Sequence, residues 1–230
     1  MINRPTSKIL LATLASLFLH LNSSLLHAQS YEFQAISTSE PILRTLWYAK
    51  DSKKIKIVAT ALMRSESYKY DLGPNVIFYG ERVDEEGKPI AEAIAKLPTD
   101  ATRVLLFFNK LKKPDEFGLN YEVIVLEDDY SNFPFGSFRF INASDKNLAI
   151  KVSEEELTLS IGETKIVKVR PSTKDLGIDI ATYISEEDKW LRGYSSLWGH
   201  RENLRTLVFI ANDPNGGIRT LRFRESGEIE

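Results

Sequence analysis

Residues 147–170 read NLAIKVSEEELTLSIGETKIVKVR, and this stretch decides the fold. Leu148, Ile150 and Val152 alternate with Ala149 and Lys151, so one face of the extended chain is apolar. A side-chain period of two is typical of a half-buried β-strand. The letters SIGE then place a glycine turn between two further runs of strand-forming residues. The stretch therefore predicts consecutive strands of an antiparallel β-sandwich.

The same pattern extends outward over most of the chain. Short runs rich in β-branched and aromatic residues alternate with Gly, Pro, Asn and Asp, as in all-β proteins. Strands are predicted over residues 42–48, 54–60, 75–81, 103–109, 121–127, 137–142, 148–152, 155–159, 164–170, 178–184, 205–211 and 218–224. Residues 91–97 (AEAIAKL) combine helix formers with flanking prolines, which leaves a strand or a short helix open.

Three runs are apolar at consecutive positions rather than alternate ones: residues 104–108, 76–79 and 207–210. A strand that is buried on one face alternates apolar and polar residues, whereas a strand that is buried on both faces is apolar at consecutive positions. We therefore expect these three strands to be central and covered on both faces.

The segment EDDYSNFPFG, residues 127–136, is the predicted boundary between two domains. It joins three carboxylates to a Pro/Gly turn, and it is too short and aromatic for a flexible linker. We predict two packed antiparallel β-sandwich domains, residues 29–130 and residues 131–230, with one large sandwich as the alternative. No internal repeat is visible in the sequence.

Residues 1–28 are predicted to be a signal peptide. Arg4 and Lys8 precede an apolar run at residues 9–21, and the small Ala28 precedes Gln29. We therefore expect a secreted or periplasmic protein with no membrane span after cleavage. An uncleaved leader that acts as an anchor is the alternative.

Composition narrows the possible functions. Without residues 1–28 the chain has 28 basic and 32 acidic residues, and it has no cysteine. An acidic chain does not favour nucleic acid as a partner. The lack of cysteine excludes disulfides, thiolate catalysis and a lipid anchor on cysteine. We predict no cofactor and no metal.

Catalytic residues are not predicted either. His200 is the only histidine after residue 28, and no G-x-S-x-G motif accompanies it, so we interpret it as a loop or surface residue. Acidic clusters occur at residues 84–86, 127–129, 154–156 and 186–188, and solvated turns are the expected setting. A calcium loop at residues 213–216, or a carboxylate pair that hydrolyses glycans, is the alternative.

One segment combines aromatic and cationic side chains. Residues 189–201 read KWLRGYSSLWGHR, and they are predicted to form a loop between two strands. Such residues can stack on sugar rings or bind a peptide. The candidate ligand-binding residues are Trp190, Arg192, Tyr194, Trp198, His200 and Arg201. In the alternative, the two tryptophans fold back and cap the core.

A resemblance to known proteins rests on the residues 133–144 (FPFGSFRFINAS) and 159–163 (LSIGE). Within roughly residues 126–170 the chain resembles uncharacterised secreted bacterial β-sandwich proteins. This resemblance implies an immunoglobulin-like or transthyretin-like sandwich and brings no activity with it.

Together these observations predict an exported, non-catalytic binding or structural module. The expected partner is an unidentified envelope protein or a glycan. A carboxylate-dependent glycan hydrolase and a subunit of a cell-surface assembly are the alternatives.

Overall fold

The computed structural model describes residues 30–227 except positions 39, 62, 170–175 and 185–188. The predicted signal peptide therefore lies outside the described residues. The described part of the chain contains β-strands and no helix, which confirms the all-β fold class. In this part, no helix is long and apolar enough to cross a membrane.

The first eight strands form two four-stranded sheets. They are β1 (Tyr31–Ser37), β2 (Ile42–Lys50), β3 (Lys53–Ala59), β4 (Tyr68–Tyr70), β5 (Asn75–Val83), β6 (Pro89–Lys96), β7 (Arg103–Lys110) and β8 (Tyr121–Glu127). We call the sheet with the order β3-β2-β5-β6 the N-outer sheet, and the sheet with the order β4-β1-β7-β8 the N-inner sheet.

The next eight strands form two more sheets. They are β9 (Ser137–Ala143), β10 (Leu148–Val152), β11 (Glu155–Leu159), β12 (Thr164–Lys168), β13 (Leu176–Ile184), β14 (Lys189–Trp198), β15 (Leu204–Asn212) and β16 (Ile218–Ser226). The C-inner sheet has the order β12-β9-β15-β16, and the C-outer sheet has the order β11-β10-β13-β14.

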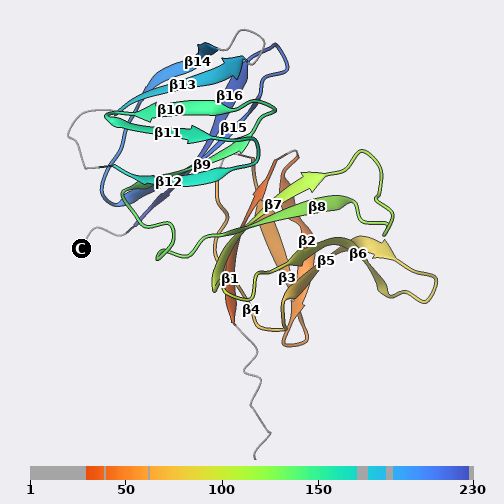
Figure 1. Ribbon diagram of the computed structural model, residues 1–230. Coiled ribbons are helices and arrows are strands. Elements are labelled where there is room, and N and C mark those ends of the chain that lie inside the picture. Colours follow the sequence, from red (N-terminus) through yellow and green to blue (C-terminus); the bar gives the residue numbers. More distant parts are fainter. Residues whose placement is uncertain (1–29, 39, 62, 170–175, 185–188, 228–230) are drawn as a thin grey trace, which may run out of the picture.

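The four sheets follow one another as layers (Figure 1), and the buried residues form an apolar core between each pair of neighbouring sheets. The core between the two N sheets contains Phe33 and Phe78. The core between the two C sheets contains Phe138 and Trp198. A third core joins the two inner sheets around Phe107, so the two halves are packed against each other as the fold prediction requires.

The third core explains the strands that are apolar at consecutive positions. In β7, Leu105 and Phe107 face the C half, while the alternate residues face the N core. The Phe107 ring lies edge-on to Phe209 and Phe223, with centroids 4.8 and 5.5 Å apart. The prediction that residues 104–108 and 207–210 are covered on both faces is therefore confirmed. It is wrong for residues 76–79, because Ile77 of β5 is 37% exposed.

The two halves share one topology. Adding eight to each strand number converts the N-half orders into the C-half orders. β1–β7 and β9–β15 are parallel pairs, and the remaining pairs within the sheets are antiparallel. A bulge also repeats, because Glu92 of β6 and Gly193 of β14 are each the extra residue opposite a partner strand. The chain thus contains a structural repeat that the sequence did not show.

The antiparallel prediction needs one correction in each half. The first strand of the half inserts beside the seventh and runs in the same direction, so both inner sheets are mixed. Sequence patterns carry no direction for such distant partners. The domain boundary at residues 130 and 131 stays a prediction, although the chain does pass from the N-inner to the C-inner sheet between β8 and β9.

Each predicted strand overlaps an observed one, and three observed strands, β1, β4 and β14, were not predicted. The ambiguous residues 91–97 lie largely in β6. Ala93 and Ala95 are fully buried in the N core at alternate positions, so packing outweighs the helix propensity of alanine.

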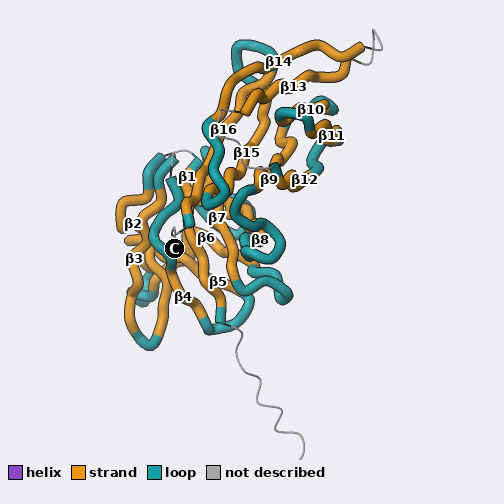
Figure 2. The backbone as a smooth tube through the Cα atoms, turned by 90° about the vertical axis from the view of Figure 1, so that its left-hand side faces the viewer, coloured by secondary structure: helices purple, strands orange, loops and turns teal. Residues whose placement is uncertain are grey.

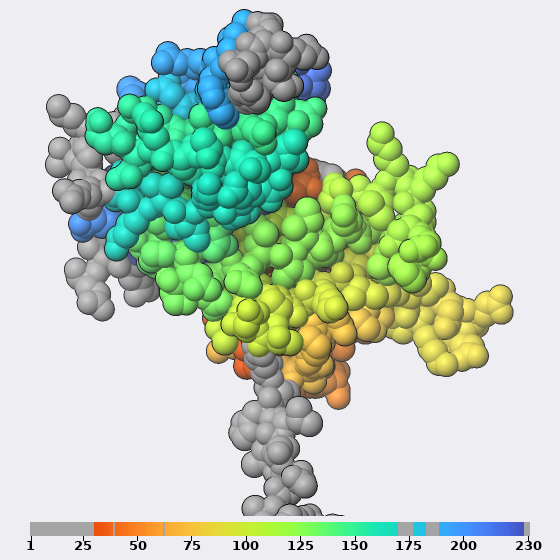
Figure 3. Space-filling model, in the orientation of Figure 1, coloured from red at the N-terminus to blue at the C-terminus, as the bar shows by residue number. Residues whose placement is uncertain are grey.

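Three hairpin turns have the same local structure. Each turn begins with an aspartate: Asp84, Asp115 or Asp213. The Oδ1 atom of the aspartate accepts a hydrogen bond from the backbone N–H two residues later. Its backbone carbonyl accepts a hydrogen bond from the N–H of a glycine three residues later. Those glycines have φ between 77° and 99°, which side chains disfavour. The turns at residues 84–89 and 212–217 connect paired strands, β5 to β6 and β15 to β16. The first two project from one side of the molecule (Figure 3).

Candidate functional site

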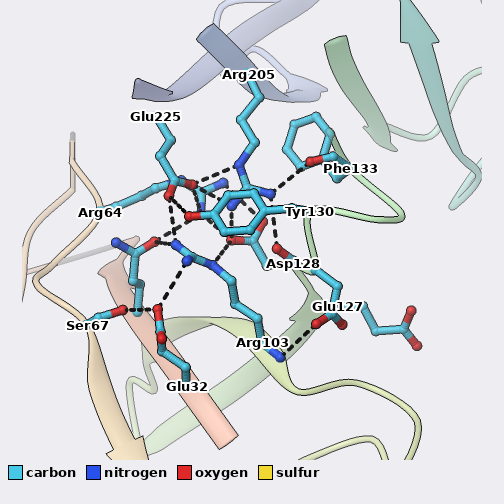
Figure 4. Close-up of polar contacts among 12 residues, drawn as sticks. Glu32, Arg64, Ser67, Arg103, Glu127, Asp128, Tyr130, Phe133, Arg205 and Glu225 are labelled. Carbon is cyan, nitrogen blue, oxygen red and sulfur yellow. Dashed lines mark hydrogen bonds and ion pairs between the residues drawn. The ribbon is translucent and has the colours of Figure 1, made fainter. Parts of the chain in front are cut away.

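Polar side chains from both halves meet in the interface between the inner sheets (Figure 4). We call this group the ionic cluster. It contains three arginines and three carboxylates: Glu32, Arg64, Arg103, Asp128, Arg205 and Glu225. The first four belong to the N half and the last two to β15 and β16 of the C half. The formal charges balance, which reduces the cost of taking them out of water.

Arg205 is the centre of the cluster, and its side chain is 0% exposed. Its Nη2 lies 2.7 Å from Asp128 Oδ2 and 2.5 Å from Glu225 Oε2. Its Nη1 donates hydrogen bonds to the carbonyls of Asp128 and Phe133. One side chain of β15 therefore holds the segment that leaves β8.

Two N-half arginines complete the contacts. Arg64 Nη1 lies 2.5 Å from Asp128 Oδ2 and 3.2 Å from Glu225 Oε2. Arg64 Nη2 reaches Asp128 Oδ1, and Arg103 Nη2 reaches Glu225 Oε1 at 2.7 Å. All four oxygens of these two carboxylates thus contact guanidinium groups. Such an arrangement suits a structural link between the halves better than proton transfer.

Aromatic rings cover the same arginines. The guanidinium carbons of Arg103 and Arg205 lie 4.4 and 4.5 Å from the centroid of Tyr130. The Tyr130 hydroxyl donates to Glu225 Oε1 at 3.0 Å, and its ring stacks on Phe135. Tyr130 is 43% exposed, and cation–π contacts at such a site add a modest stabilisation to the network. The aromatic residues of segment 127–136 therefore lie against the arginines that join the halves.

The segment predicted as a binding loop is mostly a strand. Residues 189–198 form β14, which pairs with β13 along its whole length as a long hairpin (Figure 2). The loop prediction was wrong because the bulge at Gly193 interrupts the period of two. A Cβ at Gly193 would lie 3.0 Å from Ile218 Cγ1, so a side chain there would crowd β16.

The predicted binding residues divide between the core and the surface. Trp198 is 1% exposed and His200 is 6% exposed, so neither is presented to a ligand in solvent. Trp198 Nε1 donates to the half-buried Tyr194 hydroxyl at 3.1 Å. Trp198 therefore caps the C core, as the alternative interpretation expected of both tryptophans, whereas Trp190 is 45% exposed.

The other members of the set lie outside the core. Arg201 is exposed beyond the end of β14, and Arg192 and Trp190 are exposed on the strand itself. Residues two apart in a strand share a face, so Trp190 and Arg192 lie on the same side. Ligand binding by these exposed residues stays a prediction.

His200 is not the surface residue that we expected. Its ring packs against Phe138 of β9, with centroids 4.8 Å apart. Burial lowers the pKa of His200 below its ordinary value of 6.5, because the charged form would lose water.

The pKa shift predicts a pH dependence of stability. The unfolded chain takes up a proton near pH 6.5 while the folded chain resists it, so stability is full above that pH and falls below it. We expect the melting temperature of the wild type to fall more between pH 7 and pH 5 than that of His200→Phe. Thermal melts of both proteins across that range measure the difference, and parallel curves would contradict the prediction.

The outer face of the C-outer sheet carries a hollow of about 630 Å³. Its floor consists of small side chains, Ala149, Thr158 and Ala181, which lie side by side on neighbouring strands. Two ion pairs stand around this floor: Lys151–Glu156 at 3.1 Å and Arg192–Asp179 at 3.5 Å. Of the predicted binding residues, Arg192 lines this hollow.

Two structural features escaped sequence reasoning. Asp128 belongs to an acidic run expected to be a solvated turn, yet it is 1% exposed in the ionic cluster. Trp47, which no motif singled out, lies on the outer face of the N-outer sheet beside Tyr79. The described residues contain no cluster of three or more His, Cys, Asp or Glu that could hold a metal.

Comparisons with known proteins add little. No protein-family model matches the chain, and no curated protein matches it. Among solved structures, one described as a "putative cell adhesion protein from Bacteroides uniformis" is 9% identical, with 86% of this chain and 97% of that chain covered. Its TM-score is 0.24, which is too low to support any conclusion about this chain.

Proposed function

We propose that the chain is an exported, non-catalytic binding module whose C-outer sheet takes a hydroxyl-rich ligand such as a glycan. The observation that carries the proposal is the hollow of about 630 Å³ on that face. Concave sites of several hundred Å³ with a few placed polar groups are the usual setting for ligands.

The chemistry of the hollow matches a neutral polyol. Lys151 and Arg192 supply donors, and Glu156 and Asp179 supply acceptors, each held by its ion pair. Sugar hydroxyls both donate and accept hydrogen bonds, so they can use both kinds of group. The floor at Ala149 and Ala181 lies in the row of the sheet beside the two pairs and leaves room for a ring there.

Filling the hollow tests the proposal. Ala181→Phe places a ring on the floor, and we expect it to weaken binding to a neutral polysaccharide at least about tenfold, or about 1.4 kcal/mol. Affinity electrophoresis over a polysaccharide panel measures the change. The matched control is Ala49→Phe, an exposed alanine of β2 on the N-outer sheet. If Ala181→Phe and Ala49→Phe bind the polysaccharide equally well, the hollow is not the binding site.

A hydrolase is the second candidate, because Glu156 and Asp179 both line the hollow. β10 separates their strands, and each carboxylate is paired with a cation. The same polysaccharides can be assayed for new reducing ends. Release that is abolished by Asp179→Asn would replace the binding function with catalysis.

A further inference from the structure

The outer face of the N-outer sheet is an apolar and aromatic surface at the opposite end of the stack from the hollow. Leu43, Ile77 and Ile94 on this face are 63%, 37% and 42% exposed. Ile77 of β5 pairs with Ile94 of β6, so the two side chains lie next to each other. Their strand neighbours Val76, Phe78, Ala93 and Ala95 are buried in the N core, which fixes the outward direction of the isoleucines.

An aromatic pair occupies the middle of this face. Trp47 of β2 pairs directly with Tyr79 of β5, and their rings stack with centroids 4.8 Å apart. The Trp47 indole donates a hydrogen bond to the Gly80 carbonyl at 3.2 Å, which holds the ring against the sheet. Lys54 Nζ lies 4.5 Å from the centre of the Trp47 ring.

Cationic side chains accompany the apolar ones. Lys56 is opposite Trp47 on β3, and Lys96 lies two residues after Ile94 on β6. Among the residues that the structure describes, neither these two lysines nor Lys54 forms a salt bridge. Glu81 is an exposed carboxylate on the same side of β5 as Ile77 and Tyr79. The three lysines outnumber this carboxylate, so these residues together give the face a net positive charge.

From this combination we propose that the outer face of the N-outer sheet docks on an anionic lipid bilayer. Lysines within a Debye length of such a surface are attracted to its headgroups. Tryptophan and tyrosine prefer the headgroup level, and exposed aliphatic side chains reach the acyl boundary. An acidic polysaccharide would use the lysines and the rings but would leave Leu43, Ile77 and Ile94 in water. A second copy of the same face would oppose its lysines to like charge.

Flotation with vesicles tests the docking. The wild type and all variants are produced and purified in the same way. If the apolar segment 9–21 is retained, it then contributes equally to vesicle binding in every protein. The probes are vesicles of phosphatidylcholine alone and of equal parts phosphatidylcholine and phosphatidylglycerol. We expect the wild type to bind the anionic vesicles and to release them as salt rises. Each lysine removed should weaken binding about fivefold, and Lys54→Gln/Lys56→Gln/Lys96→Gln about a hundredfold.

A matched variant separates this face from general charge. Lys151→Gln/Lys165→Gln/Arg192→Gln removes the same charge from the surroundings of the C-outer hollow. It should bind anionic vesicles as the wild type does. Equal loss in both triple variants, or no loss in the first, would overturn the docking face without touching the glycan proposal.

The aliphatic residues decide between a bilayer and an acidic polymer. Leu43→Ser and Ile77→Ser/Ile94→Ser should each weaken vesicle binding, and neither should change binding to dextran sulfate. Leu43 is the most exposed of the three, so its variant keeps the test valid if the double variant fails to fold. Unchanged vesicle binding by Leu43→Ser would make the face a site for acidic polymers instead.

Discussion

Arg205→Ala is expected to destabilise the protein by about 3–5 kcal/mol, because it leaves two buried carboxylates without their central cation. Asp128 and Glu225 would each lose a contact of 2.7 Å or less to a side chain that is 0% exposed. For a chain of this size the loss corresponds to a fall in melting temperature of about 6–20 °C. Urea unfolding followed by circular dichroism measures it.

The control for Arg205→Ala is Arg192→Ala, which breaks an ion pair on the surface. The Arg192 side chain is 72% exposed and lies 3.5 Å from Asp179, so we expect a change of about 1 kcal/mol or less. If Arg205→Ala is no more destabilising than Arg192→Ala, the ionic cluster does not hold the two halves together.

Trp198→Ala is expected to cost about 3–5 kcal/mol, because it opens a cavity in the C core. Its ring lies 6.0 Å from Phe138 and 6.4 Å from Phe140, and the Arg222 guanidinium covers it at 4.7 Å. Trp190→Ala on the same strand removes a ring that is 45% exposed, and we expect it to cost about 1 kcal/mol or less.

The two tryptophan variants are compared by urea unfolding at the same pH. A large loss from Trp190→Ala and a small one from Trp198→Ala would invert the assignment of core and surface on β14. Glycan binding provides a second readout, since Trp190 lies on the side of Arg192. Loss of binding in Trp190→Ala at full stability would place that ring in the site.

Local patterns predicted the strands whose partners are near in sequence. β10 and β11 pair through a tight turn, and the alternation of Leu148, Ile150 and Val152 carries the information for both the strand and its buried face. The double-sided burial of β7 was also readable, because five consecutive apolar residues need two cores.

The ionic cluster could not be predicted, because its partners are far apart in the chain. Asp128 and Arg205 are separated by 77 positions, and nothing in EDD distinguishes the buried carboxylate from its half-buried neighbours. The binding segment failed for a local reason. The bulge at Gly193 shifts the alternation of inward and outward side chains along β14. The sequence of this strand therefore lacks a regular period of two and resembles that of a loop.

The parallel pairs also bear on how the chain folds. Glu32 at the start of β1 meets Arg103 of β7 across 71 residues, so the first strand has no permanent neighbour on that side until the seventh is available. Closing loops of this length slows folding, and the repeat of the same topology imposes the delay twice. Until the parallel pair of a half has formed, the apolar side chains of its unpaired strand are exposed and can make non-native contacts. Each half therefore has to form one long-range parallel pair before its inner sheet is complete.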